Sequence, residues 1–256
     1  MHRFFIPLSS IELDQVWFPP ELAHQLYHVL RLRPGENVMV LDNLGHELQV
    51  ELEQVEAGEA TGKIVGRTQV NTEPHAWISL YLCLSRRGKF EWMLQKCTEV
   101  GATTLIPVVS SRCLVKDTKS PDQKIDRWQK IVQEAAEQAH RGRLPELLTV
   151  MKFEEACQHA SQRNQRVMIA WEEESLSMPR QSIHQALSGL SNQLEGGDSS
   201  PSLAIIIGPE GGFSSEEVSL ASQAGIIPVS LGKRILRMET AAVVATALLL
   251  YELGEI

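Results

Sequence analysis

The residues best suited to bind a ligand and do chemistry gather in the last quarter of this 256-residue chain. A β-branched run, residues 203–207, leads directly into a glycine-rich turn at 208–213 (GPEGGF). A second glycine turn begins at Leu231 and Gly232 and ends with residues 237–240 (RMET). An uninterrupted apolar run predicts a strand buried on both faces, and glycines at its end let the backbone pass close to a ligand. This pattern is typical of a cofactor site at the carboxyl ends of the strands of an α/β protein.

Taken alone, the first glycine turn is neither a GxGxxG fingerprint nor a P-loop, because it lacks the GK[ST] ending. It also fits a tight turn before a helix that is capped by Ser214 or Ser215, with Glu216 and Glu217 in its first turn. However, two glycine turns, each between a buried strand and an apolar helix, can bring two backbones together around one flat ligand. The second turn therefore favours a ligand site.

The elements that position these turns predict two domains, with a boundary near residue 72. Before it, alternating runs at 37–41, 47–52 and 60–65 are typical of a small antiparallel barrel, and an amphipathic helix is expected over 20–32. Residues 71–74 (NTEP) have the composition of a linker. We therefore expect a barrel domain over 1–72 and a second domain over 73–256.

In the second domain strands and helices alternate, which predicts a mostly parallel sheet with helices on its faces. Residues 190–202, rich in Gly, Ser and Asn, are expected to form a mobile surface loop. The expected strands are 78–85, 104–109, 167–171 and 204–207, and the expected helices are 90–100, 122–140 and 181–190.

Composition narrows the classes of protein that the chain can belong to. The longest apolar stretch, residues 241–251, is interrupted by Thr246 and falls short of the roughly 20 residues that a membrane span needs, so we expect a buried helix. The four cysteines form no CxxC pair, and the amino terminus lacks an apolar core of signal-peptide type. We expect a reduced cytoplasmic protein without structural zinc.

The net charge of −8 argues against a nucleic-acid partner at first sight. The distribution of charge differs: residues 85–143 hold 12 Lys or Arg against 7 Asp or Glu, whereas residues 1–72 hold 5 against 10. One basic segment in an acidic protein leaves room for a phosphate-rich partner.

Several motifs follow one another along nearly the whole chain. They are residues 3–5 (RFF), 28–36 (HVLRLRPGE), 95–101 (QKCTEVG) within the stretch 89–101, 110–112 (SSR) with Lys116, Glu137 and Gln138 followed by Arg141, Arg143 and Pro145, and both glycine turns. In this order the motifs resemble the RsmE family, the 16S ribosomal RNA uridine-N3 methyltransferases of the SPOUT superfamily.

The resemblance implies an amino-terminal PUA-like β-barrel and a carboxy-terminal SPOUT α/β domain with a deep trefoil knot. Periodicity alone would not predict a knot, because knots are nearly absent from proteins. The knotted domain would bind S-adenosylmethionine, mainly through backbone groups of the knot loops, and would form a homodimer. No metal is implied, since methyl transfer from a sulfonium needs no Lewis acid. By resemblance the cofactor-binding candidates are Gly208, Glu210, Gly211, Gly212, Leu231, Gly232, Leu236 and Ala241, with Ala170 and Trp171 as a third wall.

Methylation at N3 of uridine makes a specific demand, because that nitrogen carries a proton which must leave as the nitrogen attacks. The enzyme needs positioning, a proton acceptor, and positive charge near the developing anionic base. Arg237, Glu239 and Thr240 cluster at the second turn. Our hypothesis is that Arg237 stabilises the uracil oxygens and Glu239 accepts the proton, directly or through water. Alternatively, Glu239 only caps the last helix beside Thr240, and Arg237 only pairs with it across a dimer.

Basic residues are expected to contact RNA phosphates, which positions an RNA without reading its sequence. A solvated surface role is as compatible with each single arginine, but the set favours a groove between the domains or across a dimer. The RNA-binding candidates are Arg3, Arg31, Arg33, Arg112, Lys116, Arg141 and Arg143.

Other chemically capable residues give weaker signals. His24, His28 and Cys97 belong to no recognisable Ser/His/Asp or Cys/His pairing. The five tryptophans are scattered and predict no stacking platform, and the acidic run 172–174 (EEE) is expected to be a solvated loop.

Three function classes remain open. The leading one is a methyltransferase that acts on N3 of a uridine in 16S ribosomal RNA, within the small ribosomal subunit. A second is a SPOUT methyltransferase acting on another RNA position or on a ribose 2′-hydroxyl. The third is a non-catalytic ribosome-binding factor, which would need a degenerate cofactor loop, whereas both glycine turns are whole.

Overall fold

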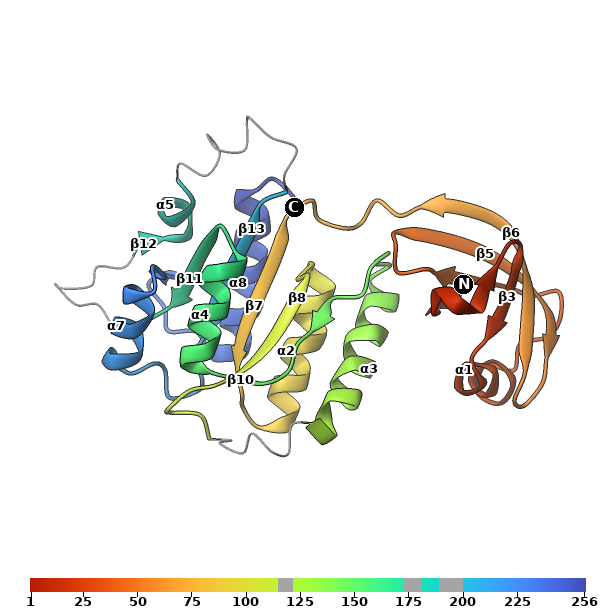
Figure 1. Ribbon diagram of the computed structural model, residues 1–256, viewed down its shortest axis with the longest axis horizontal. Helices are drawn as coiled ribbons and strands as arrows, with labels where there is room; N and C mark the ends of the chain where they lie inside the picture. Colours follow the sequence, from red (N-terminus) through yellow and green to blue (C-terminus); the bar gives the residue numbers. More distant parts are fainter. Residues whose placement is uncertain (115–121, 173–180, 189–199) are drawn as a thin grey trace. The chain divides into compact units, whose positions relative to one another are not determined.

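The computed structural model describes residues 1–114, 122–172, 181–188 and 200–256, which form two compact units (Figure 1). The first unit comprises Met1–Glu73 together with Gln133–Leu144, and the second comprises Pro74–Val132 and Pro145–Ile256. The chain therefore returns to the first unit after the expected linker. Among the described residues, no helix is both long and apolar enough to cross a membrane.

The first unit is built on one six-stranded sheet with the order β1-β4-β5-β6-β3-β2. Alternating apolar residues turn inward along its strands, as Leu48, Val50 and Leu52 do along β5, and they pack against Ala23 and Leu26 of the helical segment. The β1–β4 pair is parallel and the other pairs are antiparallel. The strands are β1 (Arg3–Phe5), β2 (Ile11–Glu12), β3 (Gln15–Phe18), β4 (Asn37–Leu41), β5 (His46–Val55) and β6 (Ala60–Gln69), and the 3-10 helix η1 is Leu8–Ser10.

The helix expected over residues 20–32 is wrong in its second half. The α-helix α1 (Pro20–His24) continues as a π-helical turn, η2 (Gln25–Val29). The helical segment ends there because Arg31 adopts a left-handed backbone with φ +56°, and the Leu32 N–H donates back to the Leu26 carbonyl at 3.0 Å. This bond closes the helix end in the manner of a Schellman motif.

The second unit contains the mostly parallel sheet that the sequence predicts, and all the strand pairs described in it are parallel. The strand order is β10-β8-β7-β13-β11-β14-β12, with β9 beside β8. Its strands are β7 (Trp77–Cys83), β8 (Thr104–Val109), β9 (Glu146–Leu147), β10 (Met151–Lys152), β11 (Arg166–Ala170), β12 (Gln181–Ser182), β13 (Ser202–Ile207) and β14 (Ile227–Ser230).

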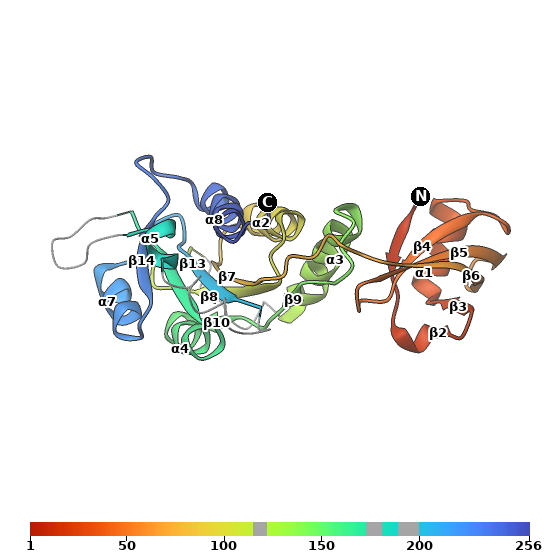
Figure 2. The same cartoon turned by 90° about the horizontal axis from the view of Figure 1, so that it is seen from above.

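Helices cover both faces of this sheet, with α2 and α8 on one side and α4 and α7 on the other (Figure 2). The helix expected over 181–190 is wrong at its start, because Gln181 and Ser182 pair with β14 and the Ser182 hydroxyl caps α5. The expected loop over 190–202 lies outside the described residues as far as residue 199. The helices are α2 (Arg87–Val100), α3 (Asp122–Gln138), α4 (Phe153–Arg163), α5 (Ile183–Leu187), α7 (Ser215–Gln223) and α8 (Met238–Glu252).

Three neighbouring strands bring the site together. β13, β11 and β14 lie side by side and are parallel, so their carboxyl ends meet at one edge of the sheet. The first glycine turn leaves β13 after Ile207 and the second leaves β14 after Ser230. The residues of β13 from Leu203 to Ile207 are buried, which holds both turns on a rigid base.

An ion pair ties residues 133–144 to the end of the barrel within the first unit. Arg141 is 3% exposed, and its guanidinium donates to both carboxylate oxygens of Glu73, at 2.7 and 3.3 Å. The same carboxylate accepts the backbone N–H groups of Gly142 and Arg143, at 3.0 and 3.3 Å.

We predict that Arg141→Met destabilises the first unit by about 3 kcal/mol, because the Glu73 carboxylate loses its charge partner in a poorly solvated place. Urea unfolding would measure this change. Arg143→Met, at an exposed arginine two residues away, is the matched control and should change the unfolding free energy by less than about 0.5 kcal/mol. Equal effects of the two changes would contradict the structural role of Arg141.

Candidate active site

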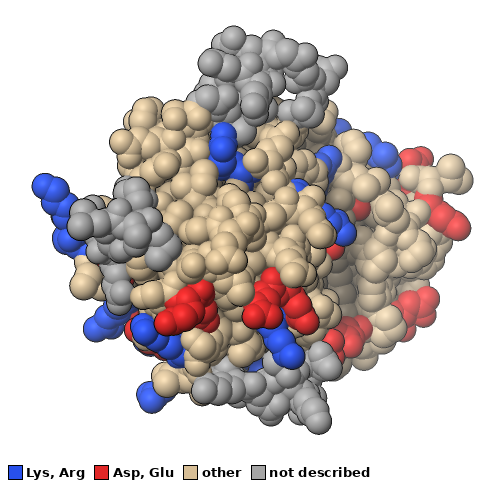
Figure 3. Space-filling view, turned by 60° about the vertical axis from the view of Figure 1, so that its left-hand side comes forward, with Lys and Arg blue, Asp and Glu red and all other residues tan. Residues whose placement is uncertain are grey.

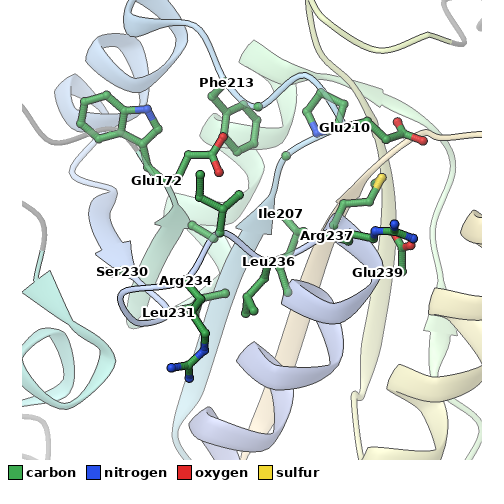
Figure 4. Close-up of a pocket in the computed structure, with 18 of the residues that line it drawn as sticks. Glu172, Ile207, Glu210, Phe213, Ser230, Leu231, Arg234, Leu236, Arg237 and Glu239 are labelled. Atoms are coloured by element: carbon green, nitrogen blue, oxygen red, sulfur yellow. The ribbon is translucent and has the colours of Figure 1, made fainter.

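A cavity of about 620 Å³ opens at the carboxyl ends of β13, β11 and β14 (Figure 4). Cavities of roughly 300–1,000 Å³ are usual for cofactors and other small molecules. The walls come from the ends of the three strands, both glycine turns, the start of α8, and two residues from elsewhere in the second unit. The lining residues are Lys89, Arg112, Ala170, Trp171, Glu172, Ile207, Gly208, Pro209, Glu210, Gly212, Phe213, every residue from Ser230 to Glu239, and Ala241.

The first glycine turn depends on the absence of side chains. A Cβ on Gly208 would lie 3.0–3.4 Å from ring atoms of Phe213, which is buried, and Gly212 has a left-handed backbone with φ +64°. The turn is also held from outside, because the Arg112 guanidinium donates to the carbonyls of Gly211 at 3.0 Å and Phe213 at 3.3 Å. The turn is therefore a fixed backbone wall.

The helix after this turn begins as the sequence suggests, with Ser214 as its cap. The Ser214 hydroxyl accepts the Glu217 N–H at 3.2 Å, and the Glu217 carboxylate accepts the Ser214 N–H at 2.9 Å, which completes a capping box. The other Glu217 oxygen accepts the Ser111 N–H at 2.8 Å. The structural interpretation of the turn is thus correct for residues 214–217, and it coexists with the cavity.

The second glycine turn forms the facing wall. Gly232 has φ +117°, a conformation that L side chains rarely adopt, and its N–H donates to the Ser230 hydroxyl at 3.3 Å. Figure 4 shows Leu231 and Leu236 turned toward the middle of the cavity, opposite Phe213. An apolar slot between two backbone walls suits a flat ring.

The third wall carries an unpaired donor. Trp171 is 6% exposed, and its indole Nε1 has no hydrogen-bond partner among the described residues. Trp171 also lines the cavity, and buried donors nearly always find an acceptor. The neighbouring Glu172 carboxylate would lie 3.3 Å from a Cβ on Gly212, so it reaches the first glycine turn. Glu172 therefore lines the cavity and is also exposed, and residues 173–174 of the acidic run lie outside the described part.

Charged groups gather where α8 begins. Lys89, in the first turn of α2, places its Nζ 3.4 Å from Glu210 Oε1 and 3.9 Å from Glu239 Oε2. The Glu239 Oε2 atom is buried and accepts no hydrogen bond from the described residues, since the 3.9 Å contact is an ion pair too long for a hydrogen bond. Arg237 precedes α8, its side chain does not cap the helix, and it forms no ion pair within the described part of the chain.

The cavity brings together most of the residues that the sequence proposes for cofactor binding and catalysis. Gly211 and Thr240 are not among its lining residues: Gly211 turns its carbonyl to Arg112, and Thr240 follows Glu239 within α8. The predicted residues that do line the cavity are Ala170, Trp171, Gly208, Glu210, Gly212, Leu231, Gly232, Leu236, Ala241, Arg237 and Glu239. Their individual roles stay predictions.

Several lining residues are not among the site candidates predicted from the sequence. Lys89 lies 121 residues before Glu210, and no local pattern links the two. Ile207 and Ser230 directly precede the two glycine turns and Phe213 ends the first one, so these lining residues belong to the same local motifs. Arg112 was proposed as an RNA contact, and the structure shows it holding the first glycine turn.

The other described basic candidates lie in the first unit, where they differ in burial and in their partners. Arg3 pairs with Glu47, and Arg141 is buried against Glu73. Arg143 is exposed and its guanidinium lies 3.5 Å from the Leu44 carbonyl. Arg31 and Arg33 are exposed. Lys116 lies outside the described residues. On the face drawn in Figure 3, Lys and Arg are interspersed with Asp and Glu and do not merge into one basic patch.

Cys97 is buried in the core, and burial raises the pKa of its thiol to about 12. Within the described ranges, no group of three or more His, Cys, Asp or Glu side chains is arranged to hold a metal ion.

Parts of both units match known protein families. A family model described as an RNA methyltransferase domain matches residues 72–250, and one described as an RNA methyltransferase PUA domain matches residues 19–65. The chain is 32% identical to ribosomal RNA small subunit methyltransferase E of Bacillus subtilis, over 98% of this chain and 97% of that protein. It is 34% identical to the protein of the same name from Synechocystis, over 96% of this chain and 76% of that protein.

Solved structures agree with the sequence matches. Ribosomal RNA small subunit methyltransferase E from Neisseria gonorrhoeae, bound to S-adenosyl methionine, superposes with a TM-score of 0.80 at 28% identity and covers 98% of this chain and 97% of its own. A Legionella pneumophila protein solved with the bound cofactor SAM gives a TM-score of 0.82 at 28% identity, covering 97% and 96%. The PUA-like and mostly parallel α/β architecture expected from the sequence is therefore confirmed.

We predict that Gly208→Val lowers the affinity for S-adenosylmethionine at least tenfold, because the new side chain meets the buried Phe213 ring and displaces the first glycine turn. Titration calorimetry would measure the affinity. Gly58→Val is the control, at a glycine with open space around its Cβ position and no left-handed backbone. Unchanged affinity in a folded Gly208→Val protein would show that the turn does not line the cofactor.

Proposed function

The chain belongs to the ribosomal RNA small subunit methyltransferase E family, and we propose that it methylates N3 of one uridine in 16S ribosomal RNA, within the small ribosomal subunit. It is an S-adenosylmethionine-dependent ribosomal RNA methyltransferase. The observation that supports a reaction with proton removal, as N3 requires, is the buried carboxylate oxygen of Glu239 at the edge of the cavity, which accepts no hydrogen bond from the described residues.

The residues of this cavity fit the cofactor. Two glycine turns leave backbone groups open to a ligand, Leu231 and Leu236 provide apolar surface for a ring, and the Trp171 indole N–H has no acceptor among the described residues. When bound there, S-adenosylmethionine supplies an electrophilic methyl group on a sulfonium. The chain's own residues must then prepare the acceptor nitrogen.

N3 of uridine is a poor nucleophile until its proton leaves. Glu239 offers a buried carboxylate oxygen that accepts no hydrogen bond from the described residues, which suits a proton acceptor. Proton loss spreads negative charge over the two uracil carbonyl oxygens. Arg237 stands two residues before Glu239 and its guanidinium is not engaged by a carboxylate of the described residues, so it is available to stabilise that charge.

Lys89 adds a second cation to this arrangement. Its ammonium lies within 4 Å of Glu210 on the first glycine turn and of Glu239 on α8. By joining the two carboxylates, it holds the turn and the start of α8 in one geometry. We propose that Lys89 is a positioning residue for Glu239.

The protein is acidic overall, so RNA phosphates need local positive charge to bind to it. Contacts by exposed arginines, such as Arg31, Arg33 and Arg143, would place the RNA through its phosphates. Since ribosomal RNA is the substrate, we place the enzyme in the cytoplasm.

We also propose that the enzyme is a homodimer that pairs through α8. This helix is apolar around its whole circumference, and a helix of that kind is normally covered on all sides. Val244 is only half-buried, and Tyr251 is 66% exposed. We expect sedimentation to show a dimer of the native chain and a monomer after Val244→Asp, and a monomeric native chain would rule the proposal out.

The test of the function is the rate of methyl transfer from labelled S-adenosylmethionine to small ribosomal subunits that lack the modification. We predict that Glu239→Gln lowers kcat at least about 100-fold while cofactor affinity stays within twofold, because the amide cannot accept the N3 proton. Glu216→Gln, at an exposed carboxylate of α7, should keep the native rate. Full turnover by Glu239→Gln at every pH would show that another group takes the proton.

A further inference from the structure

Exposed aromatic rings and arginines share one stretch of the first unit, and the rings have no part in the function proposed above. His24, Tyr27 and His28 lie on the α1–η2 helical segment, and Arg31 and Arg33 follow it directly. All five side chains are exposed, and Tyr27 is 45% exposed. We call these five residues the ring-arginine surface.

The backbone under this surface is held in two unusual conformations. The π-helical turn is closed by the Leu30 N–H donating to the Gln25 carbonyl at 2.9 Å, and such turns occur often at functional sites. Arg31, with φ +56°, takes the position after the helix that glycine normally fills. An arginine here costs stability, and its exposed side chain adds nothing to the core.

The rings are pre-arranged. The His24 and His28 centroids lie 4.4 Å apart, and Tyr27 meets His28 edge-on, with centroids 4.8 Å apart and planes at 88°. An edge-on contact covers a face of only one of the two rings. Leu26, fully buried in the barrel core, anchors the segment, so the rings stand on a fixed base.

The arginines are also displayed on a fixed backbone. The Arg33 N–H donates to the Glu36 carboxylate at 2.6 Å, and the Gly35 N–H donates to the Leu52 carbonyl of β5 at 2.7 Å. No carboxylate of the described residues pairs with the guanidinium of Arg31 or Arg33. Both charges are therefore open to an anion from outside the unit.

We propose that the ring-arginine surface binds an unpaired nucleotide of the RNA substrate, with the base stacked on Tyr27 and the neighbouring phosphates on Arg31 and Arg33. Rings beside free arginines match single-stranded RNA, whose splayed bases stack on aromatic side chains while phosphates meet cations. The surface lies within residues 19–65, the part that matches the RNA methyltransferase PUA domain. The inference rests on the proposed function only in taking RNA as the substrate.

The test compares a 12-nucleotide single-stranded RNA with its duplex by fluorescence anisotropy, using the full-length protein. The native chain should bind the single strand more tightly than the duplex. Tyr27→Ala should weaken single-strand binding about tenfold, in the range that removing one stacked base causes, and Tyr27→Phe should stay within twofold of the native chain. Binding of S-adenosylmethionine should be unchanged in both variants.

A matched pair of glycine substitutions separates strain from contact. Arg31→Gly and Leu13→Gly both relieve a left-handed residue of the first unit, since Leu13 has φ +50° and is 93% exposed. Both should keep or raise the melting temperature, but only Arg31→Gly should weaken RNA binding, by at least threefold.

Native RNA affinity in both Tyr27→Ala and Arg31→Gly would overturn the proposal. If these variants bound the RNA normally but lost methyl transfer to small subunits, a ribosomal protein would be the partner, which also overturns it. A native chain that binds single-stranded RNA through this surface but transfers no methyl group would refute the proposed function alone.

Discussion

The structure of the site depends on one constraint: two turns of backbone must approach the same ligand from opposite sides. That approach requires neighbouring parallel strands whose carboxyl ends coincide, and β13, β11 and β14 supply them. It also requires positions without side chains, as the Phe213 ring beside Gly208 and the left-handed backbones of Gly212 and Gly232 show. The buried β-branched strand and the glycines are therefore both needed to form the site.

Two charged side chains also hold the site in its geometry. Arg112 fixes the first turn through two carbonyls, while Lys89 links the carboxylate of that turn to Glu239 at the start of α8. Both cations come from parts of the chain that precede the glycine turns by about a hundred residues or more. The first turn and the start of α8 are therefore held in place by residues distant in sequence, and loss of either cation should disturb the cavity.

Much of this could be predicted from the sequence, because the signals are local. The buried run before Gly208, the second turn at Gly232 and the pair of Arg237 and Glu239 are each visible within about ten residues. The cap at Ser214 was one of two open choices, and the capping box with Glu217 decides it. The features that could not be predicted are those fixed by contacts between residues far apart in the sequence.

Lys89 meets Glu210 only because α2 and the first glycine turn share one edge of the sheet. The buried pairing of Arg141 with Glu73 arises because the chain returns to the first unit, and no residue spacing in the sequence indicates that return. The helix α4 was missed although Phe153, Ala156, Cys157 and Ala160 form an apolar stripe, because small residues give a weak periodic signal. The π-helical turn before Arg31 has no counterpart in helix propensity at all.

The most direct test of the central claim is to identify the methylated nucleoside. Small ribosomal subunits lacking the modification would be treated with the enzyme and labelled S-adenosylmethionine, and their RNA digested to nucleosides and separated. The account predicts that the label appears in N3-methyluridine. Label on a ribose 2′-oxygen or on another base would contradict it, because we propose that Glu239 accepts the proton from N3 of uracil.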